Sequence, residues 1–566
     1  INMGGSYNAI TGNWGESQVG STKISISSNG AASWCELTNG VQLTYLTCDV
    51  LPSSSFIYKA DINRVTDLDY VNFSWSNILC EDFDSDGYYA QGGCNTQVDC
   101  NDTANTIYPG AGEICANGID EDCSGADLSC SVGGIIYIDN SLGGDCTNYN
   151  PSTRSCGMGS QAAYNTLQEA ANVVLPGDTV FVRGGTYYGV EINGRALGGL
   201  LANSGTAGNS ITFEAFNGEK AILDGQKIYR WAFSSNYRPE GYSYLVIRGL
   251  EITNYTSTAL FFENSNNIIM EDLEIHDTLG TAIYISYSQD IIVRNIHAHH
   301  NYLGVKLGTH NDALGIVNRN VRVEHNYIHH NMDLNFMGDA IPVWHTDSAI
   351  IKDNVLHDNS DCASSGGANI NGVFENNIIY RSGYFDVPII APGADGCGFK
   401  FSVGVKGGNN TFKGNVIFGP GGEGAGIQNN GDLGNTFIHN TIYSSNPDQG
   451  FLFVGDNDTN VSNNIACDNT PDANSPTSGR VDTNFWCDGS AVGTNVLTGD
   501  PKFVQTNVNT IISGIVTDLN SPDFGDVPGL HLQAGSPLID NGTIIPGVHC
   551  PDSDDVDPYQ TGCRHW

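Results

Sequence analysis

One short pattern recurs along residues 252–442 and constrains the fold more than any other feature of the sequence. Each copy places a central apolar residue among polar ones, and successive central residues lie 23, 23, 30, 28, 23, 38 and 25 positions apart. Short strands that repeat at such a spacing without helices between them are typical of a β-solenoid, in which each repeat forms one coil. We therefore predict an all-β solenoid with coils stacked about 4.8 Å apart. The central residues are Ile252, Ile275, Ala298, Ile328, Leu356, Ile379, Ile417 and Ile442.

Two further columns of side chains keep the same register. An asparagine stands two positions before several central residues, and stacked asparagine amides can hydrogen-bond from coil to coil at a turn. This column predicts a ladder of Asn326, Asn354, Asn377, Asn415, Asn440 and Asn464. A ring-bearing residue stands one position after the central residue. This second column predicts a stack of His276, His299, His329, His357, Tyr380, Phe418 and Tyr443.

The histidines of this stack also suggest zinc binding or general-base catalysis. They recur at one place per coil, however, and no carboxylate recurs with them at a spacing typical of metal ligands. We therefore interpret them as a structural stack along one edge of the solenoid.

The segment before the repeats carries a family resemblance. Its sequence, YNTLQEAANVVLPGDTVFVRGGTYYGV, predicts an amphipathic helix over 166–174, a Pro-Gly-Asp turn and a strand. Residues 160–465 resemble the right-handed parallel β-helix superfamily of pectate-lyase-like proteins, and PGDTVFVRGGTY resembles the N-terminal cap of that superfamily. GSPLIDNGT, near the end of the chain, resembles the closing segment of many bacterial β-helix proteins. The resemblance implies that the solenoid is a right-handed parallel β-helix.

A dense group of acidic residues and cysteines precedes the β-helix. Asp82, Asp84 and Asp86 alternate with other residues and are followed by Gly87, which is the D-x-D-x-D-G start of a calcium-binding loop. Alternate carboxylates on a tightly turning backbone converge on one hard cation. The glutamate at the twelfth position of an EF-hand loop is missing, and so are its flanking helices. The sequence therefore predicts a calcium site that is not an EF-hand.

The whole acidic segment resembles the Cys-rich metal-binding repeats of bacterial surface proteins, which are similar to thrombospondin type 3 repeats. The resemblance implies calcium as the cofactor and a structural role, in which metal and disulfides stiffen the joint before the β-helix. It implies two groups of ligands. The first is Asp82, Asp84, Asp86, the carbonyl of Tyr88, Asp99 and Asp102, and the second is Glu113, Asn117, Asp120 and Asp122.

Charge and cysteine content narrow the class of protein. The net charge of −39 argues against nucleic acid as a partner, because phosphates need lysine and arginine. The 16 cysteines are an even number, which favours disulfides and a secreted, extracellular or cell-surface location. The sequence has no apolar run long enough for a membrane span.

Four regions follow from these patterns. We expect a small β unit, either a partial sandwich or donor strands, over residues 1–79 and the acidic calcium-binding module over 80–130. The β-helix with its cap helix is expected over 131–465, and C-terminal coils with a disulfide-stapled cap over 466–566.

One face of the β-helix is a candidate carbohydrate cleft. Aligning the strands AIYI, GVKL, AIPV, GFKF and GIQN places Tyr284, Lys306, Pro342, Lys400 and Gln428 in one outward column. A polysaccharide lyase needs a lysine or arginine base at C5 of a uronate and a cation on its carboxylate. The segment around Lys400 resembles the lysine-bearing strand of some calcium-dependent pectate lyases, and Asp339, Asp347 and Asp395 are available acids. The catalytic candidates are Lys400, Lys306 and His345, and the substrate-binding candidates are Tyr284, Trp344, Asp347 and Gln428.

Three functions remain open. The favoured one is an extracellular structural or adhesive surface protein that assembles into a filament or layer, because the strongest motif is a structural metal site. Copies of the chain would pair through the ends of the solenoid or by N-terminal strand addition. The first alternative is a calcium-dependent polysaccharide lyase or another glycan-cleaving enzyme. The second is a non-catalytic glycan-binding module for cell-surface or environmental polysaccharide.

Overall fold

The computed structural model divides into two compact units, Ile1–Ser131 and Val132–Trp566. In residues 1–81 it describes the backbone of strands β1 to β8. From residue 82 to 538 it describes the chain except for residues 91–95, 110, 112–118, 126–133, 193–194, 198–199, 310–314, 316, 333–337, 386–388, 391–395, 402–406, 420–424, 444–449, 455–457, 468, 470–471, 474–478, 490–491, 506 and 534–535.

The first unit begins with antiparallel strands, as the alternating sequence predicts. Two three-stranded sheets have the orders β5-β2-β8 and β4-β3-β7, and β1 pairs with β6. The strands are β1 (Asn2–Tyr7), β2 (Ala9–Glu16), β3 (Ser21–Ser27), β4 (Cys35–Leu37), β5 (Gln42–Thr44), β6 (Ser53–Ser55), β7 (Ile57–Asn63) and β8 (Leu68–Ser76).

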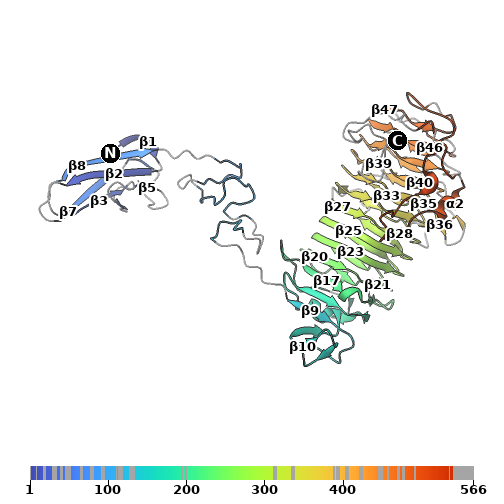
Figure 1. Ribbon diagram of the computed structural model, residues 1–566, viewed down its shortest axis with the longest axis horizontal. Coiled ribbons are helices and arrows are strands. Elements are labelled where there is room, and N and C mark those ends of the chain that lie inside the picture. Colours follow the sequence, from blue (N-terminus) through green and yellow to red (C-terminus); the bar gives the residue numbers. More distant parts are fainter. Residues whose placement is uncertain are drawn as a thin grey trace. The chain divides into compact units, whose positions relative to one another are not determined.

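The second unit is a parallel β-helix with three ladders of strands, stacked coil upon coil from β9 to β48 (Figure 1). The first ladder contains β9 (Ile135–Ile138), β13 (Thr179–Val182), β17 (Ile211–Ala215), β20 (Ser243–Arg248), β23 (Asn266–His276), β25 (Gln289–His299), β27 (Asn318–Glu324), β31 (Ile350–Lys352), β34 (Val373–Glu375), β39 (Thr411–Lys413), β42 (Thr436–Ile438), β45 (Thr459–Ser462) and β47 (Gly479–Asp482).

The second ladder shares the long strands β23 and β25 with the first. Its other strands are β14 (Gly185–Tyr188), β18 (Ala221–Asp224), β21 (Glu251–Thr253), β28 (Tyr327–His329), β32 (Val355–His357), β35 (Ile378–Tyr380), β40 (Val416–Phe418), β43 (Thr441–Tyr443), β46 (Ile465–Cys467) and β48 (Phe485–Trp486).

The third ladder is a separate nine-stranded parallel sheet. It contains β19 (Phe233–Ser234), β22 (Leu260–Glu263), β24 (Thr281–Ser286), β26 (Leu303–Leu307), β29 (Val343–Trp344), β33 (Ser364–Gly367), β38 (Phe399–Phe401), β41 (Ile427–Asn429) and β44 (Phe451–Phe453).

Short elements cap and flank the coils. At the N-terminal end α1 (Leu167–Ala171) has a capping box, in which Thr166 and Glu169 satisfy each other's backbone N–H groups. This helix confirms the predicted position of the cap helix. The remaining elements are β10 (Cys146–Asn150), β11 (Ser155–Cys156), β12 (Gln161–Tyr164), β15 (Val190–Ile192), β16 (Arg195–Leu197), η1 (Phe216–Gly218), β30 (Thr346–Asp347), β36 (Tyr384–Phe385), β37 (Ile389–Ile390), α2 (Val508–Ser513) and η2 (Pro528–Leu530).

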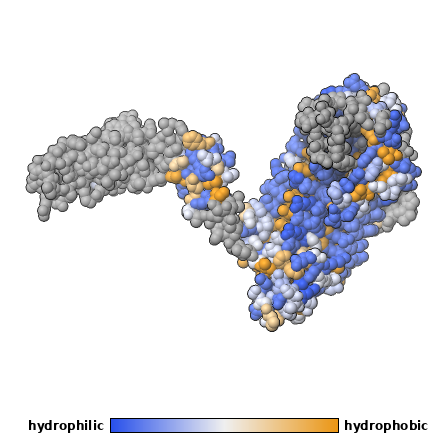
Figure 2. Space-filling model, viewed as in Figure 1, coloured by the Kyte–Doolittle hydropathy of each residue, from blue (hydrophilic) through white to orange (hydrophobic). Residues whose placement is uncertain are grey.

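The central apolar residues of the repeat form the core, as predicted. All eight are fully buried, and strand pairing places each opposite the next. Because side chains alternate across a strand, their neighbours point outward and tolerate polar residues. The face of the β-helix seen in Figure 2 is accordingly mostly hydrophilic.

The asparagine ladder is also confirmed. Asn326 Nδ2 donates to Asn354 Oδ1 at 2.9 Å, and the same bond continues coil by coil through Asn464. The structure adds Asn484, which accepts from Asn464 Nδ2 at 2.9 Å. A second corner, not predicted, carries Asn301, Asn331 and Asn359 in the same arrangement. These amides satisfy buried groups where the backbone leaves the ladder.

The predicted ring stack lies on the outer side of the second ladder. The His357 and Tyr380 rings are 4.4 Å apart and tilted by 5°, and Tyr380 and Phe418 continue the stack at 5.4 Å. From β32 onward the C-terminal segment covers this side, because apolar residues of 503–538 join one cluster with those of the strands. That cluster includes Val355, Ile378, Tyr443, Ile465, Phe503, Ile511, Val527, Leu530 and Leu538.

Disulfides fasten both units. Their pairing was left open by the sequence, and among the described residues the pairs are Cys100–Cys123, Cys146–Cys156, Cys362–Cys397 and Cys467–Cys487. None of the helices within the described ranges is long and apolar enough to cross a membrane.

Candidate functional site

Strand pairing places the predicted column on the third ladder, but Pro342, predicted to point outward, is buried. Strand pairing sets Tyr284 beside Lys306, and Lys400 beside Gln428. Ser365 lies next to Lys400 and belongs to the same column, although the sequence SSGG gave no sign of it. Two lysines therefore project from one face of the β-helix, with the coils of β29 and β33 between them.

Lys306 is held against an aromatic ring. Its Nζ lies 5.0 Å from the centroid of the Tyr284 ring, within the range of a cation–π interaction. Burial lowers the pKa of Lys306, and the charge of Asp339 opposes that shift. A lysine with a lowered pKa is more often neutral and able to accept a proton.

Two carboxylates lie between the lysines. Asp339 is nearly buried; its Oδ1 accepts the backbone N–H of Cys362 at 3.0 Å and its Oδ2 accepts the hydroxyl of Ser365 at 2.5 Å. Burial raises the pKa of Asp339 well above its usual range, the neighbouring Asp361 adds to this rise, and Lys400 opposes it. One oxygen from Asp339 lies within 4.8 Å of one from Asp361. The Cys362–Cys397 disulfide joins the coil of Asp361 to the one that carries Lys400.

This arrangement suits a divalent cation. Two carboxylates this close repel each other when both are ionised, and a cation between them removes the repulsion. The oxygen donors fit a hard ion, and positive charge next to the lysines favours an anionic substrate.

Other candidate residues lie elsewhere. His345 is fully buried and Trp344 is nearly so. Residues 341–346 form one buried run, so the alternation of buried and exposed side chains that exposes Lys306 does not hold at β29. The structure thus does not bring His345 to the lysine face. Asp347 belongs to β30 and lies 3.5 Å from Arg319. Gln428 remains in the column and donates to Asn430 at 3.0 Å, whereas Asp395 lies outside the described residues.

The acidic module brings three residues of its first predicted group together. One oxygen each from Asp82, Asp84 and Asp102 lie within 4.8 Å of one another. Asp82 accepts the N–H groups of Ser85 and Gly87 at 2.6 and 2.9 Å, so the loop turns around its carboxylate. Tyr88 stacks on Tyr108 at 5.4 Å, and the Cys100–Cys123 disulfide holds the later segments.

Four carboxylate oxygens of this module are buried without a hydrogen-bond partner in the protein. They are the Oδ2 atoms of Asp84, Asp86, Asp99 and Asp102. Burial raises the pKa of Asp84, and the charges of Asp86 and Asp99 add to it. Buried carboxylates that repel one another without a partner are typical of a metal site.

The second predicted ligand group is described at Asp120 and Asp122, where the chain turns around a carboxylate as it does at Asp82. Both oxygens of Asp120 accept backbone N–H groups, from Ser124 at 2.9 Å and Gly125 at 2.8 Å. Asp122 also accepts from Ser124. Glu113 and Asn117 lie outside the described residues.

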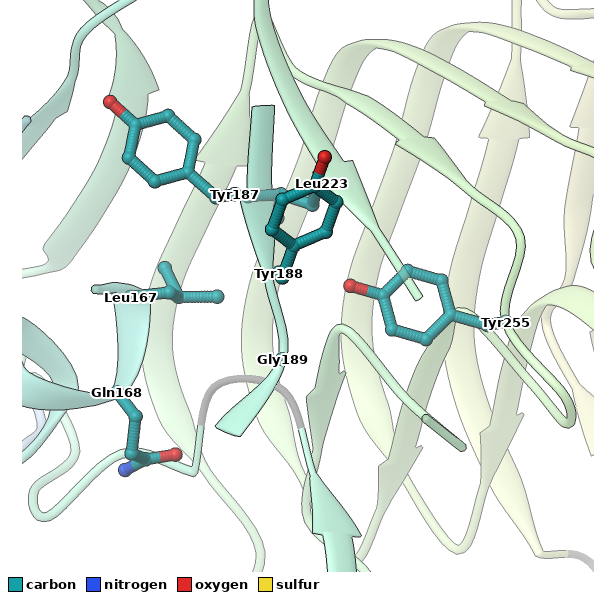
Figure 3. A pocket seen from close by; sticks show the side chains of 7 residues that line it. All are labelled: Leu167, Gln168, Tyr187, Tyr188, Gly189, Leu223 and Tyr255. Carbon is teal, nitrogen blue, oxygen red and sulfur yellow. The ribbon is translucent and has the colours of Figure 1, made fainter. Parts of the chain in front are cut away.

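A small pocket of the second unit lies beside the cap helix (Figure 3). The rings of Tyr187, Tyr188 and Tyr255 surround it together with Leu223, and its lining is largely apolar. It is lined by Leu167, Gln168, Tyr187, Tyr188, Gly189, Leu223 and Tyr255. With no charged group in its lining, we assign it no catalytic role.

The fold and the sequence define a right-handed parallel β-helix protein. Residues 148–469 match the family described as the Pel9A-like right-handed β-helix region, and the chain belongs to that family. Residues 99–127 match a second family, named Cu-binding MopE and described as a proposed metal-binding motif. These matches agree with the predicted β-helix and with a metal-binding segment before it.

Solved structures with a similar fold include both enzymes and an adhesin. The pectate lyase Pel9A is 18% identical, with 74% of this chain and 94% of that chain covered and a TM-score of 0.48. A rhamnogalacturonan lyase is 17% identical, with 71% and 97% covered and a TM-score of 0.39. PfbA, a surface adhesin of Streptococcus pneumoniae, is 12% identical, with 61% and 88% covered and a TM-score of 0.37. No curated protein matches the chain.

Proposed function

We propose that the chain is a calcium-dependent polysaccharide lyase that acts on a uronate-containing glycan at the lysine face of the third ladder. The observation that carries this proposal is the pair of carboxylates, Asp339 and Asp361, beside two lysines of one outward column. Membership in the Pel9A-like family supports it.

The residues divide the chemistry between them. Asp339 and Asp361 would hold the calcium ion, which would neutralise the uronate carboxylate and so acidify the proton at C5. Lys400 takes this proton as the base, on the basis of the resemblance of its strand to those of calcium-dependent pectate lyases. The electron pair left at C5 forms the C4–C5 double bond, and the glycosidic oxygen leaves C4 and takes a proton from water. Lys306, on the other side of the carboxylates, is the second candidate for the base because burial lowers its pKa, and Tyr284 and Gln428 of the same column would contact the polymer.

A cleavage assay tests the proposal. Full-length protein is incubated with pectate, alginate and chondroitin, with calcium or with a chelator, and ultraviolet absorbance reports the unsaturated uronate. We expect absorbance to rise for at least one polymer only when calcium is present. If none of the three is cleaved with calcium, the lyase proposal is wrong for these glycans, and binding without cleavage would favour a glycan-binding module.

We further propose that the acidic module binds calcium through Asp82, Asp84, Asp86, Asp99, Asp102 and the carbonyl of Tyr88, with Glu113, Asn117, Asp120 and Asp122 as a second group. Chelation leaves the buried oxygens of the first group unpaired and mutually repelling. At a calcium concentration of about 100 times the Kd, the bound ion stabilises the module by about 2.7 kcal/mol. We therefore expect a chelator to increase proteolysis between residues 80 and 130.

In that experiment Asp84→Asn is compared with Asp518→Asn, a control that replaces an acid of the C-terminal segment. Asp84→Asn is expected to be cleaved in calcium as quickly as the chelated wild type, and Asp518→Asn to remain protected. Equal cleavage of the wild-type module with calcium and with chelator would contradict a structural calcium site.

A structural or adhesive role is the second candidate. The observation that favours it is the continuous asparagine ladder with disulfides at three points along the β-helix, which suits a durable secreted or cell-surface protein. Copies would associate through solenoid ends or N-terminal strands into a filament or layer. Electron microscopy of purified protein in calcium tests this role, with ordered polymers as the expected result and single particles at all concentrations as the contrary one.

A further inference from the structure

Half of the histidines in the chain lie along one edge of the β-helix, at the second ladder. Seven of the fourteen are here, and they point away from the core on β23, β25, β28 and β32 and at the turns that follow. The predicted stack is present, with His276 and His299 5.0 Å apart and His299 and His329 5.2 Å apart. The seven are His276, His297, His299, His300, His329, His330 and His357.

A carboxylate lies beside two of the stacked histidines, although it is far from them in the sequence. Glu274 Oε1 lies 3.6 Å from His299 Nε2 and 3.8 Å from His297 Nδ1. Strand pairing sets Glu274 opposite His297 and His276 opposite His299. The glutamate of one coil therefore faces two imidazoles of the next coil, which stand two residues apart on one side of their strand. In the sequence no carboxylate recurs with the histidines at a spacing typical of metal ligands, and Glu274 lies near the two rings only because the coils stack.

The second nitrogen of each imidazole is held by another histidine. His297 Nε2 lies 2.9 Å from His329 Nε2, and His299 Nδ1 lies 2.8 Å from His300 Nδ1. Each ring thus turns one nitrogen toward Glu274 and has the other fixed by a hydrogen bond. Metal-binding histidines are commonly oriented in this way by a partner on their other nitrogen.

A neighbouring cluster provides a useful contrast. His330, His357 and Asp358 also lie close together, but Arg381 forms an ion pair with Asp358, and the hydroxyl of Tyr327 bonds to His357. In this second cluster the guanidinium of Arg381 therefore supplies the positive charge that a metal ion would otherwise provide. Among the described residues, no lysine or arginine forms an ion pair with Glu274.

We propose that Glu274, His297 and His299 bind one divalent transition-metal ion, such as copper or zinc, with a fourth position open to solvent. Two imidazole nitrogens and one carboxylate oxygen suit such ions better than calcium or magnesium. Ligands at about 2.1 Å from a tetrahedral ion lie about 3.4 Å apart, so small side-chain rotations close the site. The three side chains are 43%, 32% and 16% exposed, which leaves the site accessible.

The protonation state agrees with this role. Burial lowers the pKa of His297, and burial followed by the neighbouring histidines lowers the pKa of His299 to about 4. Both rings are therefore neutral near neutral pH, with lone pairs available for a metal.

Copper titration of the full chain tests the site. No histidine precedes His276, so nitrogen hyperfine splitting in the electron paramagnetic resonance spectrum reports copper on the second unit rather than on the acidic module. We expect one equivalent of copper to show coupling to two imidazoles. His300→Phe removes an orienting partner and is expected to weaken binding about 10–100-fold.

Glu274→Gln and His297→Phe remove ligands and are expected to weaken copper binding by more than the orienting variant does. His531→Phe is the matched control, because His531 also pairs with a carboxylate, Asp526, at 2.8 Å. Circular dichroism verifies folding, and Glu274→Gln, at a partly exposed side chain, keeps the test valid if His297→Phe does not fold. The proposal is overturned if copper shows no nitrogen coupling, or if Glu274→Gln binds as tightly as the control.

Discussion

Lys400→Ala is expected to abolish formation of unsaturated uronate while the protein remains folded. Lys400 stands in the outward column beside Ser365, and its charge acts on the buried carboxylate of Asp339. Removing a general base slows proton transfer by about 10²–10⁴-fold. The initial rate of absorbance increase on the cleaved polymer, measured at saturating calcium, checks this prediction.

Two companion variants test whether Lys400 acts as the base. Lys400→Arg keeps a group that can serve as the base of a polysaccharide lyase, so it is expected to retain more activity than Lys400→Ala. Lys352→Ala is the control, because Lys352 lies on β31 of the first ladder, away from the lysine column. Activity of Lys400→Ala equal to that of Lys352→Ala would rule out Lys400 as the base.

Asn415→Ala is expected to cause the largest loss of stability in the β-helix. Asn415 Oδ1 accepts from the backbone N–H and the side chain of Asn377, and its Nδ2 donates to Phe374 O and Asn440 Oδ1. Alanine leaves these buried groups unpaired, at a cost of about 1–3 kcal/mol for each one that stays unsatisfied. We expect a total of about 3–5 kcal/mol, since relaxation restores some of the bonds.

Urea denaturation followed by circular dichroism measures this loss. Gln289→Ala is the comparison, because Gln289 is an exposed residue of β25 and its replacement is expected to change stability by less than about 0.5 kcal/mol. Equal unfolding midpoints for the two variants would show that the asparagine ladder contributes little to the stability of the coils.

Features that repeat once per coil were predictable from the sequence, and contacts between coils that occur only once were not. The core, the asparagine ladder and the lysine column each repeat once per coil, so their spacing in the sequence maps directly onto strand pairing. Asp361 and Ser365 were missed because coil length varies here, and only the pairing of β33 with β38 brings Ser365 to Lys400.

Glu274 is a site residue that the sequence did not predict, and His345 is a predicted site residue that lies elsewhere. Glu274 contacts histidines 23 and 25 positions later in the sequence, a separation that no motif spacing reveals. His345 follows a strand that aligns well with the column, yet it is fully buried at the corner after β29, where its φ is +51°. Alternation predicts the direction of side chains within strands but not at the corners between them.

The most direct test of the lyase proposal traces the source of the oxygen at the new chain ends. A polymer that the protein cleaves is digested in heavy-oxygen water with calcium, and the products are analysed by mass spectrometry. Elimination breaks the bond between C4 and the glycosidic oxygen without adding water, so we predict unsaturated ends and no heavy oxygen introduced by the cleavage. Saturated products that each carry one heavy oxygen would show hydrolysis instead and would contradict the roles given to Lys400, Asp339 and Asp361.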